Sequence, residues 1–220
     1  MKRYAVIVAG GKGTRMKSLV PKQFIELKGK PILMHTLELF YTYDKGIELF
    51  LVLPEDQQLV WQELCKKHYF KIPHTVVTGG VTRFHSVSNG LKKIEGDGVV
   101  AIHDGVRPFV SLSVLDSCFK SVEKWDAVIP TIDIQESIRE IIDEGATQMV
   151  DRSKYMLVQT PQVFKTKLLK AAYNQPYSPL FTDDASVVEA FGETVHTVEG
   201  NFENIKLTTP YHLKIAEVLM

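Results

Sequence analysis

A short apolar run that ends in a cluster of glycines constrains the fold of this chain more than any other feature. The run from Tyr4 to Ala9 is uninterrupted and rich in β-branched residues, which predicts a strand buried on both faces of a sheet. Three glycines follow within four positions, and glycine lets backbone N–H groups approach a ligand closely. The same stretch carries the cations Lys12, Arg15, Lys17 and Lys22. Backbone donors beside cations predict a site for a triphosphate.

Two common glycine motifs do not fit this turn. The dinucleotide pattern G-x-G-x-x-G, started at Gly11, requires a third glycine where Met16 stands. The Walker pattern requires Gly-Lys and then Ser or Thr after a four-residue gap, and no glycine here meets that spacing. A nicotinamide dehydrogenase is therefore disfavoured. The remaining alternative to a phosphate site is a glycine-rich turn between strand and helix with lysines on its surface.

Composition places the chain among globular proteins with one α/β core. Hydrophobic residues make up 45% of its 220 residues, so we expect one domain over residues 1–220. The formal net charge is zero, but residues 1–30 hold eight of the 26 Lys/Arg and one of the 26 Asp/Glu, which favours a small anionic ligand over a nucleic-acid surface. Neither a signal peptide nor an apolar run of about 18 residues occurs, so a cytoplasmic protein without membrane contact is expected.

Strand and helix patterns alternate up to about residue 133. Such alternation predicts a mostly parallel, twisted sheet with right-handed crossovers and flanking helices, a Rossmann-like α/β fold. Ligands of such sheets bind beyond the carboxyl ends of the strands, which would bring the glycine turn, Gly79-Gly80 and Asp104 to one rim. Strands are expected at residues 49–53, 75–78, 99–103 and 127–132, and helices at 32–43, 57–68, 83–94 and 114–124.

The alternation ends at a segment with the pattern of a β-hairpin. Two alternating stretches flank the turn signal Asp143-Glu144-Gly145. Because an isolated hairpin is marginal in water, residues 134–158 are expected to project as an arm and to pack on a second copy of the chain. The alternative is a hairpin folded back on its own core. Beyond it, helices are expected at 167–173, at 185–191 and from Pro210, and short strands at 194–198 and 205–207.

Cations on the glycine turn suit a reaction at phosphorus. Nucleotidyl transfer passes through an α-phosphorus that carries extra negative charge, so Arg15 and Lys22 would stabilise the transition state, each by about 10²- to 10³-fold in rate. The structural alternative for Lys22 is a solvated surface position. Phosphate nucleophiles are ionised at neutral pH, so no general base is required, and His103 is expected to be a packed neighbour.

Two further segments follow strands that should end at the same rim. Asp104 ends an apolar strand, where an unbonded carboxylate would be unfavourable. It is expected to orient a substrate hydroxyl or to help hold Mg²⁺, or else to cap the next turn. In the segment 79–86, the glycines would let a base lie against the backbone, and the Ser86 hydroxyl could bond the edge of that base. Arg83 could instead cap or pair on a helix surface.

Eight short motifs occur in an order that resembles one enzyme family. They are A-G-G-x-G-T-R-M, P-K-Q, G-G-x-x-R-x-x-S, H-D-G-V-R-P, V-D-R, T-P-Q, T-D-D-A-S and N-I-K. Together they resemble the 2-C-methyl-D-erythritol 4-phosphate cytidylyltransferases of non-mevalonate isoprenoid biosynthesis over nearly the whole chain. The ribitol-5-phosphate cytidylyltransferases share most of these motifs and are the nearest alternative.

The resemblance implies roles for residues that the sequence pattern alone does not connect. Catalytic cations would be Arg15, Lys22, Arg152 and Lys206, and the last two would grip the attacking phosphate. The nucleotide would be bound by Ala9, Gly10, Gly11, Gly13, Gly80, Arg83, Ser86 and Val106. The polyol phosphate would be positioned by Asp104, Arg107, Ser137 and Thr160. Without the resemblance, Arg152 and Lys206 have the simpler interpretation of a hairpin-surface arginine and a strand-edge lysine.

The resemblance also implies a reaction. CMP would pass from CTP to 2-C-methyl-D-erythritol 4-phosphate, with Mg²⁺ bound by the triphosphate and pyrophosphate released. Ribitol 5-phosphate is the alternative acceptor. A non-catalytic nucleotide-binding module is the alternative of another class, against which the four catalytic cations speak. Family members are similar in being homodimers whose hairpin arms exchange, so Arg152 would act in the partner's site.

Overall fold

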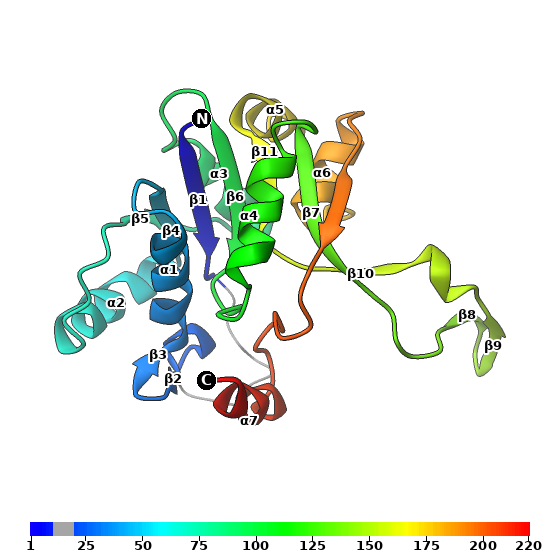
Figure 1. Cartoon of the computed structure of the whole chain (residues 1–220), viewed down its shortest axis with the longest axis horizontal. Helices are drawn as coiled ribbons and strands as arrows, with labels where there is room; N and C mark the ends of the chain where they lie inside the picture. The colour runs from blue at the N-terminus through cyan, green and yellow to red at the C-terminus, as the bar shows by residue number, and fades with distance from the viewer. Residues whose placement is uncertain (11–19) are drawn as a thin grey trace.

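The computed structural model describes residues 1–10 and 20–220 and has a twisted sheet at its centre (Figure 1). The strands of this sheet are β1 (Arg3–Val8), β4 (Glu48–Leu53), β5 (Thr75–Thr78), β6 (Val99–Asp104), β7 (Ala127–Asp133), β10 (Met156–Val158), β11 (Gln162–Lys165) and β12 (His196–Glu199). Their order is β10-β7-β11-β6-β1-β4-β5, and β12 pairs with β7 beside this path. β1 lies between β4 and β6 and runs parallel to both.

Helices cover both faces of the sheet. They are α1 (Ile32–Tyr43), α2 (Glu55–Lys67), α3 (Arg83–Leu91), α4 (Leu112–Ser121), α5 (Thr166–Ala172), α6 (Asp184–Ala190) and α7 (Pro210–Leu219). Because side chains alternate along a strand, Ala5 and Ile7 of β1 pack with α1 and α4, whereas Tyr4 and Val6 pack with α3, α5 and α6. Among the described residues, no helix is long and apolar enough to cross a membrane.

Side-chain caps fix where four of these helices begin. Thr82, Ser111, Asp183 and Thr209 each accept a hydrogen bond from the backbone N–H three residues later, at the starts of α3, α4, α6 and α7. Asp183 also takes part in a capping box with Ser186. Asp183 and Thr209 thus begin α6 and α7, the helices expected near 185–191 and from Pro210.

The α/β fold expected from the alternation is confirmed, with two differences after residue 133. β11 runs antiparallel between β6 and β7, so the sheet is mixed although mostly parallel. The strand expected at residues 205–207 is wrong. Leu207 donates one backbone hydrogen bond to the carbonyl of Val106 at 2.9 Å and is buried with Ala216 of α7. The apolar residues of this segment thus pack beneath a helix rather than in a ladder.

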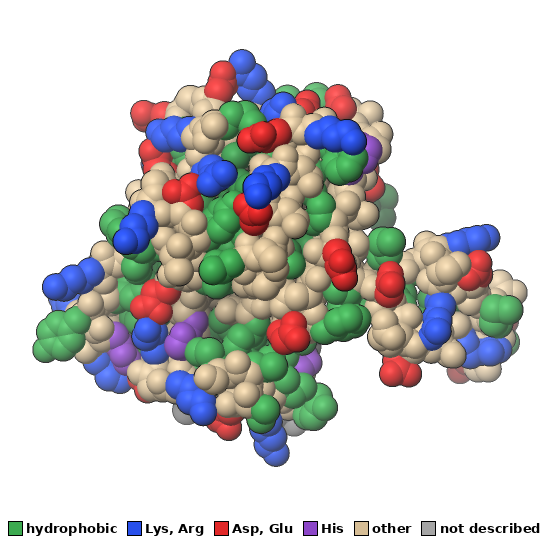
Figure 2. All heavy atoms as spheres, in the orientation of Figure 1, with side chains coloured by type: hydrophobic (Ala, Val, Ile, Leu, Met, Phe, Trp, Pro, Cys, Tyr) green, Lys and Arg blue, Asp and Glu red, His purple; other side chains and the backbone are tan. Residues whose placement is uncertain are grey.

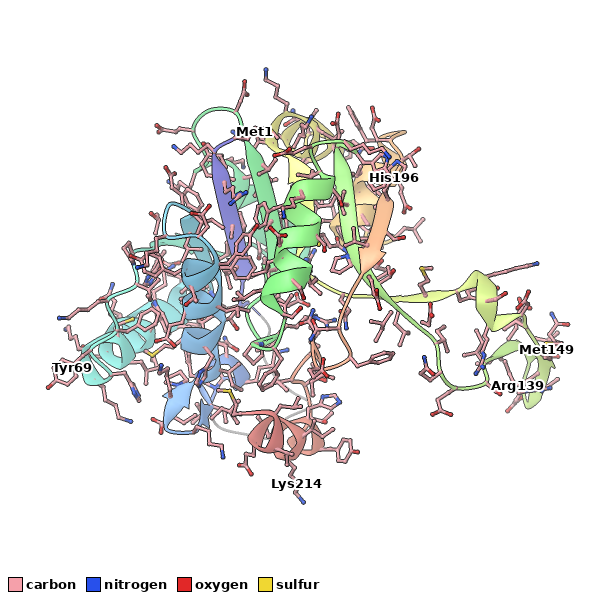
Figure 3. All side chains as sticks on the ribbon, in the orientation of Figure 1. Met1, Tyr69, Arg139, Met149, His196 and Lys214 are labelled. Carbon is pink, nitrogen blue, oxygen red and sulfur yellow. The ribbon has the colours of Figure 1, made fainter. Side chains whose placement is uncertain are left out.

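The predicted hairpin is present and stands away from the body (Figures 1 and 2). Its strands β8 (Arg139–Asp143) and β9 (Ala146–Met149) pair only with each other among the described strands. Arg139 and Met149 form one register pair, and both lie at the far end of the arm (Figure 3). Ile141 is 80% and Met149 75% exposed, so the alternative of a hairpin folded onto its own core is wrong.

A smaller layer lies at the carboxyl end of the sheet. It contains the short 3-10 turn η2 (Lys22–Phe24), the two-residue strands β2 (Glu26–Leu27) and β3 (Lys30–Pro31), and α7. Leu27 and Ile32 are buried together with Val106, Leu207 and Ala216. This packing brings the chain before α7 next to the turn that follows β6. Segments about a hundred residues apart in sequence therefore meet at the rim where the sequence predicts a ligand.

Candidate active site

The ends of β1 and β6 and the turn after β5 border one pocket, as expected for strands that run parallel. The cavity has a volume of about 230 Å³. Its described walls are Val8, Ala9, Gly10, Lys22, Gln23, Gly80, Val81, Thr82, Arg83, Ser86, Asp104, Val106 and Lys206. Three of these residues are cations and one is an anion, so the described part of the pocket suits an anionic ligand.

Asp104 is an anion close to two of these cations, Arg83 and Lys206, and to Arg107. Its Oδ2 lies 2.8 Å from Lys206 Nζ and 3.5 Å from Arg107 Nε, and its Oδ1 lies 3.8 Å from Arg83 Nε. Burial alone would raise the pKa of Asp104, but the charges of Arg83, Lys206 and Arg107 outweigh burial and hold that pKa well below its usual range. Asp104 is therefore ionised, and three cations surround it, of which Lys206 lies closest.

The described residues do not form a protein site for a metal ion. Asp104 is the only carboxylate in the described walls of the pocket, and both of its oxygens face cations. No group of three or more His, Cys, Asp or Glu residues with a suitable arrangement occurs in residues 1–10 and 20–220. Mg²⁺ is usually held by one or two carboxylates together with substrate phosphates, so the described residues alone do not supply its ligands. The expectation that Asp104 helps to hold Mg²⁺ beside the triphosphate stays a prediction.

His103 is a packed residue rather than a base. It is fully buried against Phe40, and its Nε2–H donates to the carbonyl of Arg107 at 3.0 Å. Its Nδ1 therefore accepts from the Thr160 hydroxyl, 3.1 Å away, and that hydroxyl in turn accepts the backbone N–H of Asp104 at 3.2 Å. Burial lowers the pKa of His103 to about 4. Thr160 thus helps to orient Asp104. The Thr160 hydroxyl already has two hydrogen-bond partners within the protein.

Ser86 organises the glycine turn after β5. Its hydroxyl oxygen accepts the backbone N–H of Gly80 at 3.0 Å and donates to the carbonyl of Thr82 at 2.9 Å. Gly80 lies so close to α3 that an added Cβ would approach Cβ of His85 to 2.4 Å and its carbonyl carbon to 2.9 Å. Position 80 therefore requires glycine because a larger residue would collide with α3. The predicted base-binding turn lines the pocket, but its serine already has two protein partners.

Backbone contacts hold Lys206 at the pocket. Arg107 Nη1 donates to the carbonyl of Asn204 at 2.6 Å, and Asn204 Nδ2 donates to the carbonyl of Thr160 at 2.8 Å. Asn204 is fully buried, whereas the Lys206 side chain remains 40% exposed. These contacts explain why a lysine near the end of the sequence reaches the end of β6. Arg107 thus holds the segment that carries Lys206, and it is not one of the described residues that line the pocket.

Asp184 is a site residue whose role the sequence pattern does not reveal. The T-D-D motif predicts a helix cap, and Asp183 is that cap, but Asp184 points beneath the pocket. Its Oδ2 lies 2.6 Å from Arg83 Nη2, and its Oδ1 lies 2.6 Å from the Tyr173 hydroxyl. Arg83 and Asp184 are 101 residues apart. The one sequence signal for their contact is that the motif contains a second aspartate, which the helix cap does not need.

Gln23 is a second residue that the sequence interpretation does not single out. It is fully buried, lines the pocket, and donates from Nε2 to the carbonyl of Ala9 at 2.8 Å. Its Oε1 has no hydrogen-bond partner in the described part of the chain. The contact fixes the end of β1 against the turn that carries Lys22. Its position directly after Pro-Lys in the P-K-Q motif is the signal that could have identified it.

Two predicted site residues lie on the arm and not at the pocket. Ser137 is exposed at the base of the arm. Arg152 belongs to the 3-10 turn η3 (Arg152–Lys154), donates to the carbonyl of Gln135, and lines a separate hollow with Asp133, Ile134, Ser153 and Tyr155. One chain therefore does not bring Arg152 to Lys22 and Lys206. The predicted Gly11, Gly13 and Arg15 lie outside the described residues.

Comparison with known proteins agrees with the order of motifs and with this geometry. The family model "IspD: 2-C-methyl-D-erythritol 4-phosphate cytidylyltransferase" matches residues 4–220. Proteins of that name from Bacteroides fragilis and Bacteroides thetaiotaomicron are 56% and 54% identical over 220 residues, covering 100% of both chains in each case. The crystal structure of 4-diphosphocytidyl-2C-methyl-D-erythritol synthase from Anaerococcus prevotii superposes with a TM-score of 0.84 at 29% identity, covering 99% of this chain and 95% of that one. The chain belongs to the 2-C-methyl-D-erythritol 4-phosphate cytidylyltransferase family.

Proposed function

We propose that this chain transfers CMP from CTP to 2-C-methyl-D-erythritol 4-phosphate. A phosphate oxygen of the acceptor attacks the α-phosphorus of CTP, and the new P–O bond replaces the bond to the β-phosphate. Pyrophosphate leaves, and the product is the CDP-linked polyol. The reaction needs two anions to meet at one phosphorus atom, so the protein's task is to place and neutralise charge.

The observation that carries this proposal is the set of cations on one pocket. Lys22, Arg83 and Lys206 come from three separate segments and line the same cavity beyond the carboxyl ends of β1 and β6. In the proposed reaction, Lys22 lies beside the triphosphate and Lys206 turns toward the acceptor phosphate. Ala9, Gly10 and the turn at Gly80 offer backbone and surface to the nucleotide, and Val106 offers an apolar wall to the ribose.

No proton needs to be removed by a side chain in this reaction. A phosphate monoester already carries negative charge at neutral pH, so its oxygen is a competent nucleophile. His103, which precedes Asp104, is buried and neutral, and both of its ring nitrogens have protein partners. Mg²⁺, when bound, would come with the triphosphate and neutralise part of its charge. The ion-paired Asp104 serves instead to hold the cations that meet the two substrates.

The arm belongs to the proposal as the source of Arg152. Ile141, Ile142 and Met149 are exposed on the arm, and such apolar side chains on a lone hairpin favour packing against another surface. We propose a homodimer in which each arm reaches the other subunit, so that Arg152 and Ser137 complete the partner's acceptor site. The full chain would then act as one nucleotidyltransferase domain in each subunit.

Pyrophosphate release tests the proposed reaction. The protein is incubated with CTP and Mg²⁺ and with either 2-C-methyl-D-erythritol 4-phosphate or ribitol 5-phosphate, while pyrophosphate is followed by a coupled assay. Turnover that requires the methylerythritol acceptor supports the proposal. Turnover with ribitol 5-phosphate alone would assign the other acceptor. CTP binding without pyrophosphate release from either acceptor would leave a nucleotide-binding module.

A further inference from the structure

Asp184 is a buried carboxylate beneath the pocket that the proposed reaction does not use. Its exposed fraction is 0%, so neither substrate can touch it. Its two oxygens accept hydrogen bonds from Tyr173 Oη and from Arg83 Nη2, each at 2.6 Å. Its backbone N–H donates to Gln162 Oε1 at 2.9 Å. The carboxylate is therefore a fixed negative charge with both oxygens committed.

The start of α6 does not require this carboxylate. Asp183 caps the helix through its Oδ1, which accepts the backbone N–H of Ser186 at 2.9 Å, and the Ser186 hydroxyl completes the capping box. An aspartate at the next position could point to solvent, as first-turn acidic residues commonly do. Asp184 instead points inward and takes a cationic partner from α3. Its burial needs a reason other than helix capping.

Arg83 stands between two carboxylates, and Asp184 holds it more closely. Arg83 Nη2 is 2.6 Å from Asp184 Oδ2, whereas Arg83 Nε is 3.8 Å from Asp104 Oδ1. A short charge-assisted hydrogen bond in a buried setting is stronger than an ion pair beyond hydrogen-bond distance. Burial alone would lower the pKa of Arg83, but Asp184 and Asp104 raise that pKa above its ordinary value. The guanidinium therefore stays charged, and Asp184 sets its place.

The position of Arg83 matters because Asp104 has another partner at the pocket. Lys206 Nζ lies 2.8 Å from Asp104 Oδ2. If residue 184 were neutral, Asp104 would be the one carboxylate left in an ion pair with Arg83 among the residues that the structure describes. The guanidinium would be drawn toward Asp104 and would compete with Lys206 for its oxygens. A change at a buried residue would thus reach the reacting phosphates through two cations.

We propose that Asp184 is a positioning residue for nucleotidyl transfer. It holds Arg83 at the wall of the pocket and away from Asp104, so that Asp104 retains Lys206 for the acceptor phosphate. The inference rests on the proposed function, because that function places Arg83 among the cations of the pocket and assigns Lys206 to the acceptor phosphate. It goes beyond that function by assigning a catalytic consequence to a residue that contacts no substrate.

A double-mutant cycle tests this assignment. Asp184→Asn is made in the wild-type chain and in Arg83→Gln, and the kcat/KM for pyrophosphate release and the Kd for CTP are measured for all four proteins. Asp184→Asn should lower kcat/KM by at least about tenfold in the wild-type chain but by less than about twofold in Arg83→Gln, because residues in direct contact are coupled. Equal losses in both backgrounds would overturn the assignment, since a purely structural role does not depend on Arg83.

Two further variants separate positioning from folding. Tyr173→Phe removes the other hydrogen bond to Asp184 but keeps its charge and its pair with Arg83, so kcat/KM should stay within about threefold of wild type. A loss as large as that of Asp184→Asn would contradict the proposal. If Asp184→Asn does not fold, Asp184→Glu replaces it in the cycle, because the longer side chain displaces the guanidinium while retaining the charge. The same dependence on Arg83 is then required.

Failure of the proposed function and failure of the role proposed for Asp184 give different results. Absence of pyrophosphate release with both acceptors would refute the proposed function. The cycle measured through the Kd for CTP would still decide whether Asp184 acts through Arg83. Full wild-type turnover together with independent effects of the two substitutions would refute the role of Asp184 alone.

Discussion

Lys206 Nζ lies 2.8 Å from Oδ2 of Asp104, although the two residues are about a hundred positions apart in the chain. Asp104 is the last residue of the central strand β6, and Lys206 lies in the segment before α7. This contact holds the Lys206 ammonium group at the wall of the pocket, and its side chain remains 40% exposed. In the proposed reaction, an acceptor phosphate would draw Lys206 from Asp104 without unfolding any element.

Replacing Lys206 by Ala should slow the reaction strongly. The variant removes a cation that we assign to the attacking phosphate, and loss of one such group lowers kcat by about 10²- to 10³-fold. Asp104 keeps Arg107 and Arg83 as partners, so the fold should persist. Pyrophosphate release and thermal unfolding are measured side by side. Lys165→Ala, which removes a lysine from the ion pair with Asp126, is the matched control and should remain active.

Replacing Gly80 by Ala should destabilise the turn after β5. The new Cβ would meet Cβ of His85 at 2.4 Å and its carbonyl carbon at 2.9 Å, so the turn or α3 has to move. Overpacking of this kind typically costs about 1–3 kcal/mol of unfolding free energy. Gly46→Ala is the control, because the nearest atom to its Cβ is a side-chain oxygen of Asp44 at 3.3 Å. Equal denaturation midpoints for the two variants would contradict the close contact at Gly80.

The buried His103 should make the folded state sensitive to mild acid. Its folded pKa is lowered from 6.5 to about 4, so in this interval the unfolded chain binds a proton that the folded chain does not. The unfolding free energy should therefore fall as the pH is lowered through this window, by about 3 kcal/mol from this residue. Below about pH 4, protonation of Asp104 in the unfolded chain should continue the decline, because its folded pKa is lowered as well.

Denaturant unfolding of His103→Gln at pH 7 and pH 4 checks the histidine's share. The variant lacks the titrating ring, so the difference in unfolding free energy between the two pH values should be smaller than in the wild-type chain. The comparison does not depend on whether the variant is less stable at both pH values. An unchanged difference would show that His103 is not the source of the acid sensitivity.

Mixing two inactive variants tests whether Arg152 acts in the partner's site. Arg152→Ala and Lys206→Ala homodimers should each be nearly inactive. If Lys206 and the partner's Arg152 serve the same site, a hybrid dimer has one intact site, and subunit exchange in an equal mixture should restore about a quarter of wild-type activity. No recovery after exchange, confirmed by mass spectrometry of the hybrids, would place Arg152 in its own subunit's site or outside both.

Deletion of residues 138–150 tests the arm in assembly. Light scattering should show a shift toward monomer, because the deletion removes the exposed apolar residues Ile141, Ile142 and Met149. A dimer of unchanged strength would remove the arm from assembly. The variant should retain the helix content of the body, since β8 and β9 form no ladder with any other described strand.

The fold could be predicted where local patterns and tertiary packing agree. Residues 4–9 are apolar throughout, and the structure buries β1 on both faces. β11 could not be inferred, because Gln162–Lys165 is short and its place between β6 and β7 depends on pairings far along the chain. Residues 205–207 have the alternation of a strand, but the neighbouring α7 offers them a buried surface instead.

The residues that meet at the edge of the sheet could be predicted, but the ion pairs and hydrogen bonds that connect them could not. Lys22, Gly80, Asp104 and Val106 follow from strand ends and motif order, and the structure brings them to one pocket. The contact between Arg83 and Asp184 could not be foreseen. The T-D-D motif is explained by the helix cap at Asp183, and that cap does not require a partner for Asp184. Arg152 could be placed in the site only by the family resemblance, since within the described part of one chain it lines a different hollow from Lys22 and Lys206.

A crystal structure with bound CTP tests the central claim most directly. We predict that the triphosphate lies in the pocket beyond β1 and β6, that the α-phosphorus is within reach of both Lys22 and Lys206, and that the cytosine lies against the turn at Gly80. A nucleotide bound elsewhere, or one in this pocket whose phosphates point away from Lys22 and Lys206, would contradict the account.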